Sequence, residues 1–259
     1  MSPVLLATAL VPAGMMLALW AASLRLRDVS VVDVFWGPGF AAVAWTAVAV
    51  TGGSPRGLLA AILASVWGLR LGIHLGRRKR GHGEDRRYAA MRTARGPRFA
   101  AESLVTIFLL QAALMWVISL PLQAVAALGA GRPLGLLDAA GALVVLIGVA
   151  VEATADAQLT RFLARPDSRG RVMQKGLWRW SRHPNYFGDF VVWWGLGILG
   201  VAAGAAWTLV GPALMSVLLF RVSGVTLLEK TIGTRRPGYA EYAARTSAFF
   251  PWSPRRPRT

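Results

Sequence analysis

Polar and charged side chains gather in GLWRWSRHPNYFGDFVVWWG, residues 176–195, directly before an apolar run. They are the hydrogen-bonding and charged residues Arg179, Arg182, His183, Asn185, Tyr186 and Asp189. Pro184 stops any preceding helix, and the exposed backbone N–H groups of the new helix start attract anions. Because charge next to hydrocarbon is costly, these residues need a reason to be there. The stretch predicts an anion pocket at the membrane surface, suited to phosphate.

Further polar residues occur as pairs four residues apart, so each pair shares a helix face. Arg70 and His74 form one pair, in which Arg70 should meet an acid or an anion while His74 can simply be interfacial. Glu152 and Asp156 form the other. These two acids can pair with Arg161, or they can accept hydrogen bonds from hydroxyl or amide groups of a ligand.

Asp33 lies in SVVDVFWGPGF, at the entrance of an apolar segment. It can be an interfacial residue at a helix start, or a buried acid that faces a cavity. In RGHGEDRRYAAMR, Gly81 and Gly83 permit a tight turn, so Glu84 and Asp85 should start a short helix. His82 lies beside these acids without a recognised ligand spacing, so we expect no metal site.

Seven apolar segments are each long enough to cross a bilayer, which takes roughly 20 residues in a helix. They are residues 4–24, 31–52, 57–76, 101–127, 134–155, 186–206 and 207–227. The chain has 259 residues, of which 55% are hydrophobic and none is cysteine, so disulfides and thiolate metal sites are excluded. The sequence therefore predicts an all-α polytopic membrane bundle of about seven transmembrane helices, forming one domain over residues 1–259.

The net charge of +17 resembles that of a nucleic-acid-binding protein, but its distribution indicates topology instead. Two Lys or Arg residues follow the first segment, nine the third, seven the fifth and seven the seventh, so 25 of 29 lie on one side. The positive-inside rule makes that side cytoplasmic. We expect the N-terminus outside, the C-terminus in the cytoplasm, and no nucleic-acid partner.

Two local features modify these helices. Pro121 should kink the fourth segment. The tail should break at Pro237–Gly238 and then form a short helix, with Tyr239, Tyr242 and Phe249 against the membrane surface. Residues from about 253 to 259 should be disordered.

Together with DVFWGPGF, RGHGEDRRYAAMR and the ending LLEKTIGTRRPGYAEYAARTSAFFPW, the opening stretch resembles the bacterial relatives of the steroid 5α-reductases. The resemblance covers roughly residues 29–252. It implies a membrane enzyme of seven spans, here in a bacterial inner membrane, that binds NADPH. Such an enzyme reduces the C4–C5 double bond of a 3-oxo-Δ4-steroid or a similar lipid enone. No Gly-rich nucleotide motif follows a strand, so the nucleotide would be held among helices.

The resemblance also implies roles for individual residues. The family's cofactor positions correspond to Arg70, Asp156, Arg161, Asn185, Tyr186 and Asp189, and Glu152 stands where the family has Asn. We add the neighbouring polar residues His74, Arg179, Arg182, His183, Tyr239 and Tyr242 to the expected cofactor set. The family holds the 3-oxo group with a Glu early in the chain and a Tyr in the following span. Protonated Asp33 is the candidate acid, whereas the Tyr has no clear counterpart, and Trp67 is nearest, with Tyr186 as a substitute.

Other functions stay open at this point. The isoprenylcysteine carboxyl methyltransferases share a similar RHP-x-Y-x-G block and tail, and they use S-adenosylmethionine. S-adenosylmethionine has no phosphate, so the excess of Lys and Arg on the cytoplasmic side favours NADPH. A seven-helix transporter or receptor would not require so dense a polar block. The sequence does not separate a steroid from another lipid enone, and it predicts no oligomeric state.

Overall fold

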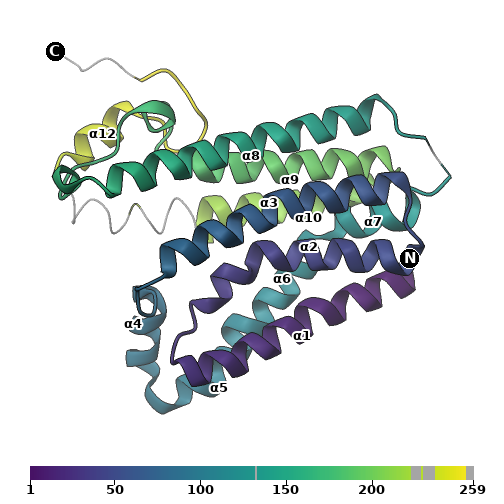
Figure 1. Ribbon diagram of the computed structural model, residues 1–259, viewed down its shortest axis with the longest axis horizontal. Helices are drawn as coiled ribbons and strands as arrows, with labels where there is room; N and C mark the ends of the chain where they lie inside the picture. The colour runs from purple at the N-terminus through teal and green to yellow at the C-terminus, as the bar shows by residue number, and fades with distance from the viewer. Residues whose placement is uncertain (132, 223–228, 230–236, 255–259) are drawn as a thin grey trace. The chain divides into compact units, whose positions relative to one another are not determined.

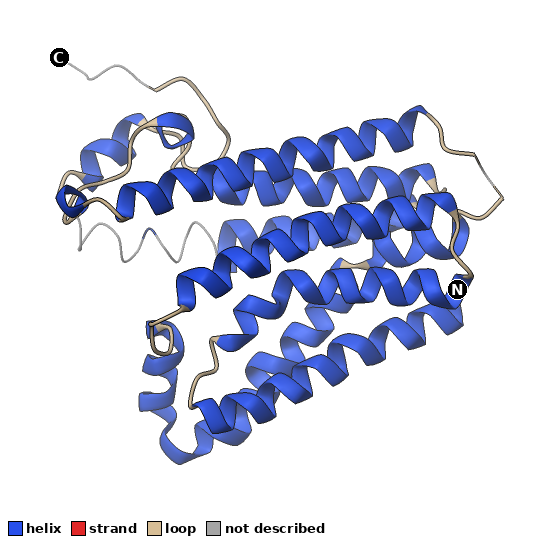
Figure 2. Cartoon of the chain, in the orientation of Figure 1, coloured by secondary structure: helices blue, strands red, loops and turns tan. Residues whose placement is uncertain are grey.

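A computed structural model describes residues 1–131, 133–222, 229 and 237–254 of the chain. Within these residues every named element is a helix, and no strand occurs (Figures 1 and 2). The expectation of an all-α protein is therefore confirmed for the described part of the chain. The chain divides into two compact units, which are described in turn. Unit 1 comprises Met1–Ala142 and Leu196–Gly211, and unit 2 comprises Leu143–Gly195 and Pro212–Thr259.

Unit 1 is built from long apolar helices followed by a segmented one. Its elements are α1 (Ser2–Leu26), α2 (Val31–Thr51), α3 (Pro55–Lys79), α4 (Arg86–Arg95), the 3₁₀ turn Gly96–Arg98, α5 (Phe99–Ser103), the π-helix Leu104–Leu109, α6 (Leu110–Ile118) and α7 (Leu120–Leu128). Figure 1 shows α2 and α3 side by side. Their backbones approach so closely that a Cβ atom on Gly37 would lie 2.4 Å from the Gly68 carbonyl oxygen. Glycine is therefore required at this crossing.

Unit 2 centres on α8 (Leu136–Leu163), whose first residues belong to unit 1, and on α9 (Pro184–Ala202), whose last residues belong to unit 1. Its other elements are the 3₁₀ turns Pro166–Ser168 and Gly176–Arg179, α10 (Val210–Val217), the π-helix Leu218–Val222 and α12 (Tyr239–Arg245). The turn Ala206–Leu209, which precedes α10, belongs to unit 1. In unit 2, α8 and α9 pack closely at two glycines. A Cβ atom on Gly148 would meet Val192, and one on Gly188 would meet Glu152.

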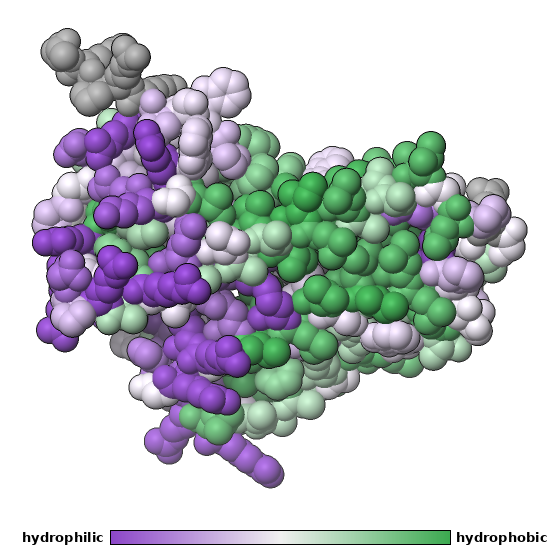
Figure 3. Space-filling view, turned by 45° about the horizontal axis from the view of Figure 1, so that its top comes forward, coloured by the Kyte–Doolittle hydropathy of each residue, from purple (hydrophilic) through white to green (hydrophobic). Residues whose placement is uncertain are grey.

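Five helices among the described residues are long and apolar enough to cross a membrane. They are Ser2–Leu26, Val31–Thr51, Pro55–Lys79, Arg86–Ile118 and Leu136–Leu163. Each of the first five expected spans falls on one of them, and Figure 3 shows hydrophobic side chains over much of the visible helical surface. The chain is therefore a membrane protein by its helices, but the expected count of seven is not confirmed. Helix α9 is not among the five, and the apolar stretch Ala206–Arg221 is shorter than a span, while the end of the seventh segment lies outside the described residues.

The expected kink at Pro121 is confirmed as a break between helices. Helix α6 ends at Ile118, Ser119 forms a turn, and α7 then begins at Leu120 with Pro121 in its first turn. The side-chain amide of buried Gln123 donates to the Trp116 carbonyl at 2.8 Å and to the Ser119 hydroxyl at 2.8 Å. The Thr8 hydroxyl donates in turn to Gln123 Oε1 at 3.0 Å. A polar network thus satisfies the groups that the break exposes inside an apolar unit.

A buried ion pair joins the starts of two helices in unit 1. Arg56 of α3 donates through Nε to Asp138 Oδ1 at 2.7 Å and through Nη2 to Asp138 Oδ2 at 2.8 Å. Asp138 also caps its own helix by accepting the Gly135 N–H at 2.8 Å. Both side chains are almost fully buried, so this pair fixes the beginning of α8 against α3.

The tail follows the expected break at Pro237–Gly238, where Gly238 adopts a φ of 80° and α12 begins. The expectation that Tyr239, Tyr242 and Phe249 lie against the membrane surface is wrong, because all three are buried within unit 2. The Tyr242 hydroxyl donates to the Trp178 carbonyl at 2.6 Å, and Phe249 packs on Phe220 with 4.3 Å between ring centroids. The expected disordered end lies outside the described residues from 255 onward.

Candidate functional site

The acids of α8 meet the polar start of α9 inside unit 2. Glu152 and Asp156 are both buried on α8. The Asn185 side-chain amide, in the first turn of α9, donates to Asp156 Oδ1 at 3.2 Å. Gly188 allows this approach, because a Cβ atom there would lie 2.6 Å from the Glu152 backbone nitrogen. The close helix contact therefore brings together an acid pair and an amide that lie about thirty positions apart in the sequence.

The loop before α9 is tied to α8 by its own hydrogen bonds. The Leu177 N–H donates to Gln158 Oε1 at 3.0 Å, and the Trp178 indole N–H donates to the Ala155 carbonyl at 3.1 Å. Gly176 has a φ of 62°, a left-handed conformation that favours glycine. These contacts set where the HPNY block begins relative to Asp156.

Glu229 accepts hydrogen bonds from the residues just before α9. Arg182 donates to it through Nε at 2.7 Å and through Nη2 at 2.9 Å, while Nη1 donates to the carbonyls of Ala243 and Thr246. His183 Nε2 lies 3.2 Å from Glu229 Oε1. Arg182, expected in an anion pocket, therefore directs its donors at protein atoms and holds the tail.

His183 is buried and stacks on Tyr186, with 5.7 Å between ring centroids and 6° between ring planes. Burial lowers the pKa of the His183 imidazole, and the Glu229 carboxylate only partly opposes this effect. The neutral imidazole therefore predominates near pH 7. It presents Tyr186 with a flat, uncharged neighbour.

The remaining residues of the expected cofactor set in unit 2 divide by burial. Arg161 and Arg179 are exposed, and Asp189 is partly buried on α9. The Tyr239 hydroxyl lies 3.5 Å from Glu229 Oε1, and burial raises its pKa to about 12. Tyr242 bonds the loop backbone, as described above. The two exposed arginines are thus the residues of this set best able to meet a phosphate.

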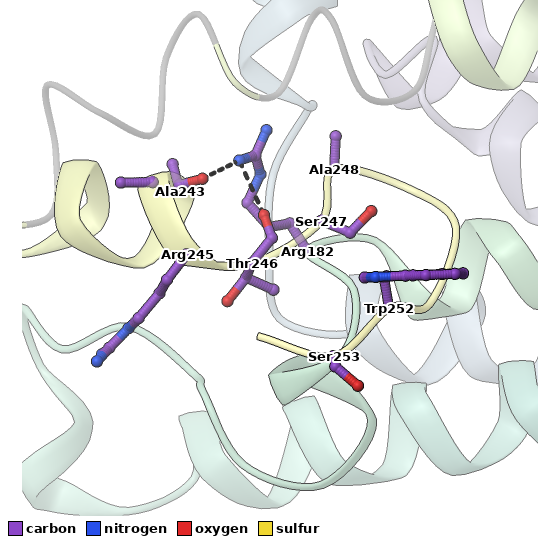
Figure 4. Close-up of a pocket in the computed structure, with 9 residues that line it drawn as sticks. Arg182, Ala243, Arg245, Thr246, Ser247, Ala248, Trp252 and Ser253 are labelled. Atoms are coloured by element: carbon purple, nitrogen blue, oxygen red, sulfur yellow. Dashed lines mark hydrogen bonds between the residues drawn. The ribbon is translucent and has the colours of Figure 1, made fainter. Parts of the chain in front are cut away.

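A cleft lies between the tail and the loop before α9 (Figure 4). Its volume is about 310 Å³, and its lining is Arg182, Ala243, Ala244, Arg245, Thr246, Ser247, Ala248, Trp252 and Ser253. Figure 4 shows Arg182 bonded to the backbone of Ala243 and Thr246, with Arg245 extending away from it. The Arg245 side chain instead donates to Gln174 Oε1 at 2.7 Å. The cleft therefore lacks the acids and amide that gather between α8 and α9.

In unit 1, Asp33 has two donors from α4. The Tyr88 hydroxyl donates to Asp33 Oδ1 at 3.0 Å, and Arg87 Nη2 lies 3.4 Å from Asp33 Oδ2. The Asp33 side chain is 36% exposed. Instead of standing alone as a donor, Asp33 forms a carboxyl–phenol pair with a tyrosine 55 residues further along the chain.

The other expected residues of unit 1 lie on α3. Trp67 is fully buried against Phe40, with 5.8 Å between ring centroids. Arg70 and His74 are partly buried one turn apart. Trp67 is therefore part of the packed core of unit 1.

A network of ion pairs ties the loop before α4 to the start of α2. The Val29 N–H donates to Glu84 Oε1 at 2.8 Å, and Arg92 binds both Glu84 oxygens at 2.8 and 2.9 Å. Burial alone would raise the pKa of the Glu84 carboxyl, but these hydrogen bonds outweigh it and lower the pKa. Asp85 caps α4 by accepting the Arg87 N–H, which confirms the expected helix start.

Two residues of these clusters are absent from the sequence-based candidates. Tyr88 lies within the motif RGHGEDRRYAAMR, where a tyrosine among arginines was a local signal. The sequence marks Glu229 only by its position as an acid that follows an apolar run. Their partners are distant in sequence, so local patterns did not identify the pairs.

The chain was compared with known families, proteins and structures. A family model described as "Protein of unknown function (DUF1295)" matches residues 19–246. Neither a curated protein nor a solved structure matches the chain.

Proposed function

We propose that this chain, which belongs to the DUF1295 family, is a membrane reductase that uses NADPH to reduce a lipid enone. The substrate class is a 3-oxo-Δ4-steroid or a similar apolar enone. The observation that carries the proposal is the hydrogen bond of 3.0 Å between Tyr88 and Asp33. A tyrosine beside an acid is the pair that the resemblance to the steroid 5α-reductases implies for holding the substrate carbonyl.

The donor set of unit 2 fits NADPH chemically. Buried Glu152 and Asp156 offer acceptors for ribose hydroxyl or carboxamide N–H groups, and Asn185 offers both a donor and an acceptor. Exposed Arg161 and Arg179 suit the phosphates. NADPH, when bound, supplies a hydride to the β carbon of the enone.

The residues of unit 1 would stabilise the charge that develops on the carbonyl oxygen. In the proposed mechanism Asp33 is protonated when substrate is bound and donates to the Tyr88 oxygen, which frees the Tyr88 hydroxyl to donate to the carbonyl. A positioned donor of this kind stabilises the enolate in the transition state. The α carbon then takes its proton from water or a nearby side chain. Arg87 beside Asp33 adds positive charge to the same place.

The proposed membrane is a bacterial inner membrane, with the N-terminus outside and the C-terminus in the cytoplasm. The one-sided distribution of Lys and Arg supports this orientation. The basic side would then face the cytoplasmic pool of NADPH.

The decisive experiment tests cofactor and chemistry together. Purified protein in lipid nanodiscs is titrated with NADPH and with S-adenosylmethionine, and NADPH oxidation is followed with a 3-oxo-Δ4-steroid while the saturated ketone is detected by mass spectrometry. We expect NADPH to bind and the ketone to form. Tyr88→Phe should lower turnover by about 10²–10³-fold, the cost of one lost oxyanion donor, with NADPH affinity unchanged.

Binding of S-adenosylmethionine in place of NADPH would instead favour the methyltransferase reading and contradict this proposal. Full turnover in the Tyr88→Phe variant would remove Tyr88 and Asp33 from the reaction.

A further inference from the structure

Three aromatic side chains are exposed together on the surface of unit 2. Trp252 is 74% exposed, Phe250 53% and Trp180 43%. The backbone N–H of Trp252 donates to the backbone carbonyl of Trp180 at 3.0 Å, so the two tryptophans are neighbours although 72 residues separate them. We call these three side chains the aromatic patch. Exposed apolar side chains gathered in one place usually mark an interaction surface.

The fold holds the backbone under the aromatic patch in place. The Arg182 N–H donates to the Ser247 carbonyl at 2.8 Å, and the Ser181 hydroxyl donates to the Phe249 carbonyl at 2.7 Å. Phe249 is buried among the rings of Phe220 and Phe190. Phe250 packs on the edge of the same cluster and leaves about half of its side chain, 53%, exposed.

The two segments that carry the patch contain cationic but no acidic residues. Residues 168–183 and 246–259 include no Asp or Glu. The cations of the first segment that are exposed are Arg169, Arg171, Lys175 and Arg179. The partner of this surface should therefore be negatively charged.

We propose that the aromatic patch and its surrounding cations bind the headgroup region of an anionic lipid bilayer. Tryptophan is enriched where a bilayer meets water, because its ring is apolar and its N–H is polar. Exposed Lys and Arg attract anionic lipids, at about 1 kcal/mol for each residue near the surface. Phe250 also packs on Phe187 and Phe190 of the apolar helix α9, which begins at Pro184 directly after the cationic segment, so the patch lies beside an apolar helix. A soluble acidic partner would match the charge but would leave the rings without an apolar environment.

The experiment uses the absence of cysteine from the chain. Ser253→Cys supplies a single labelling position beside Trp252, and an environment-sensitive fluorophore is attached there. The protein is placed in nanodiscs of phosphatidylcholine alone or with added phosphatidylglycerol. Quenching by lipids that carry a doxyl group near the headgroup then reports contact with the bilayer.

We expect clearly stronger quenching in the anionic nanodiscs, weakened by high salt because salt screens surface charge. Trp180→Ser with Trp252→Ser should abolish the difference. Phe250 is left unchanged, because its ring packs on other phenylalanines and its loss would disturb that cluster. Trp207→Ser is the matched control, because Trp207 is also exposed, at 53%, but lies in the turn Ala206–Leu209. It should leave the quenching unchanged.

Any of three results would overturn the proposal. The label could remain unquenched in both lipid compositions, or be quenched equally in the doubly substituted variant. It could also change only with protein concentration, which would point to a second copy of the chain rather than to lipid.

Discussion

The two units use their acidic side chains differently. In unit 1, acids meet cations: Asp138 binds Arg56, and Glu84 binds Arg92. In unit 2, Glu229 also binds a cation, Arg182, whereas Asp156 on α8 accepts from the neutral amide of Asn185. Acid–cation pairs hold segments together. An amide can both donate and accept, so the contact of Asp156 with Asn185 suits a polar ligand better than a fixed ion pair does.

This comparison has a testable consequence. Substitutions in the ion pairs of unit 1 should lower stability and leave cofactor binding alone. Substitutions among the proposed NADPH-binding residues of unit 2 should lower NADPH affinity and leave stability near that of the wild type. Asp33 is the exception in unit 1, because it pairs with Arg87 and Tyr88 and is also proposed to act in the reaction.

The largest effect on stability is expected for the buried pair. Asp138→Asn leaves Arg56 charged and buried without its carboxylate partner, which typically costs about 3–5 kcal/mol. Unfolding in detergent measures this loss. The exposed pair of Asp167 and Arg171 is the matched control, and Asp167→Asn should change the free energy of unfolding by about 1 kcal/mol or less. Equal effects at both positions would mean that burial does not distinguish them. Restored stability in a variant combining Arg56→Met with Asp138→Leu would confirm that the uncompensated charge is the cause.

Substitutions of Asp33 test an ion-paired acid of unit 1 that is also proposed to act in the reaction. Asp33→Leu removes the carboxyl group beside Tyr88 and should lower turnover by about 10²–10³-fold, whereas Asp33→Asn keeps a donor and should retain part of the activity. NADPH oxidation with a 3-oxo-Δ4-steroid measures both. Normal turnover in the Leu variant would make Asp33 a structural residue like Glu84. The donor role would then pass to another residue, such as Tyr186.

Local chemistry made part of this architecture predictable from the sequence. Asp85 caps a helix because its side chain reaches an N–H two residues on, and Pro121 interrupts one because it lacks an N–H. The first five apolar segments were found by length and hydropathy alone. The sixth and seventh segments are not confirmed, because α9 is not among the five helices, Ala206–Arg221 is shorter than a span, and the end of the seventh segment lies outside the described residues.

The contacts of the candidate site were less predictable, since their partners are far apart in the sequence. Tyr88 and Asp33 are 55 positions apart, and Glu229 and Arg182 are 47. No periodicity links such positions, because only the packing of helices brings them together. The same limit explains why Tyr239 and Tyr242 were expected at the membrane surface although the fold buries them.

The next effect in size is expected for Asn185 and Arg161, two of the proposed NADPH-binding residues of unit 2. Asn185→Ala should lower NADPH affinity by about ten- to a hundredfold, because a hydrogen bond to a charged group contributes about 1.5–3 kcal/mol. Arg161→Ala should act similarly through a lost phosphate contact. Isothermal titration with NADPH measures both, and Arg165→Ala is a matched control, since Arg165 is a nearby exposed arginine outside the expected cofactor set. Unchanged affinity in folded Asn185 and Arg161 variants would contradict the cofactor assignment. Stability should stay near that of the wild type.

The smallest effect concerns the pH dependence of the contacts by which Glu84 ties the loop before α4 to Val29 and Arg92, here called the tie. The pKa of Glu84 is lowered from its ordinary value of 4.5, so the unfolded chain binds its proton more readily than the folded chain. The tie therefore contributes fully above pH 4.5, and its contribution is lost as the pH falls through the lowered pKa. Melting temperatures between about pH 3 and pH 7 measure this loss.

Glu84→Gln should lower the melting temperature at pH 7 through the lost ion pair with partly exposed Arg92, by an amount equivalent to about 1 kcal/mol. The variant and wild type should then converge toward pH 3, since the protonated wild type has lost the same charge. A constant gap across this range would mean that the carboxylate charge does not stabilise the tie, and NADPH affinity at pH 7 should be equal in both proteins.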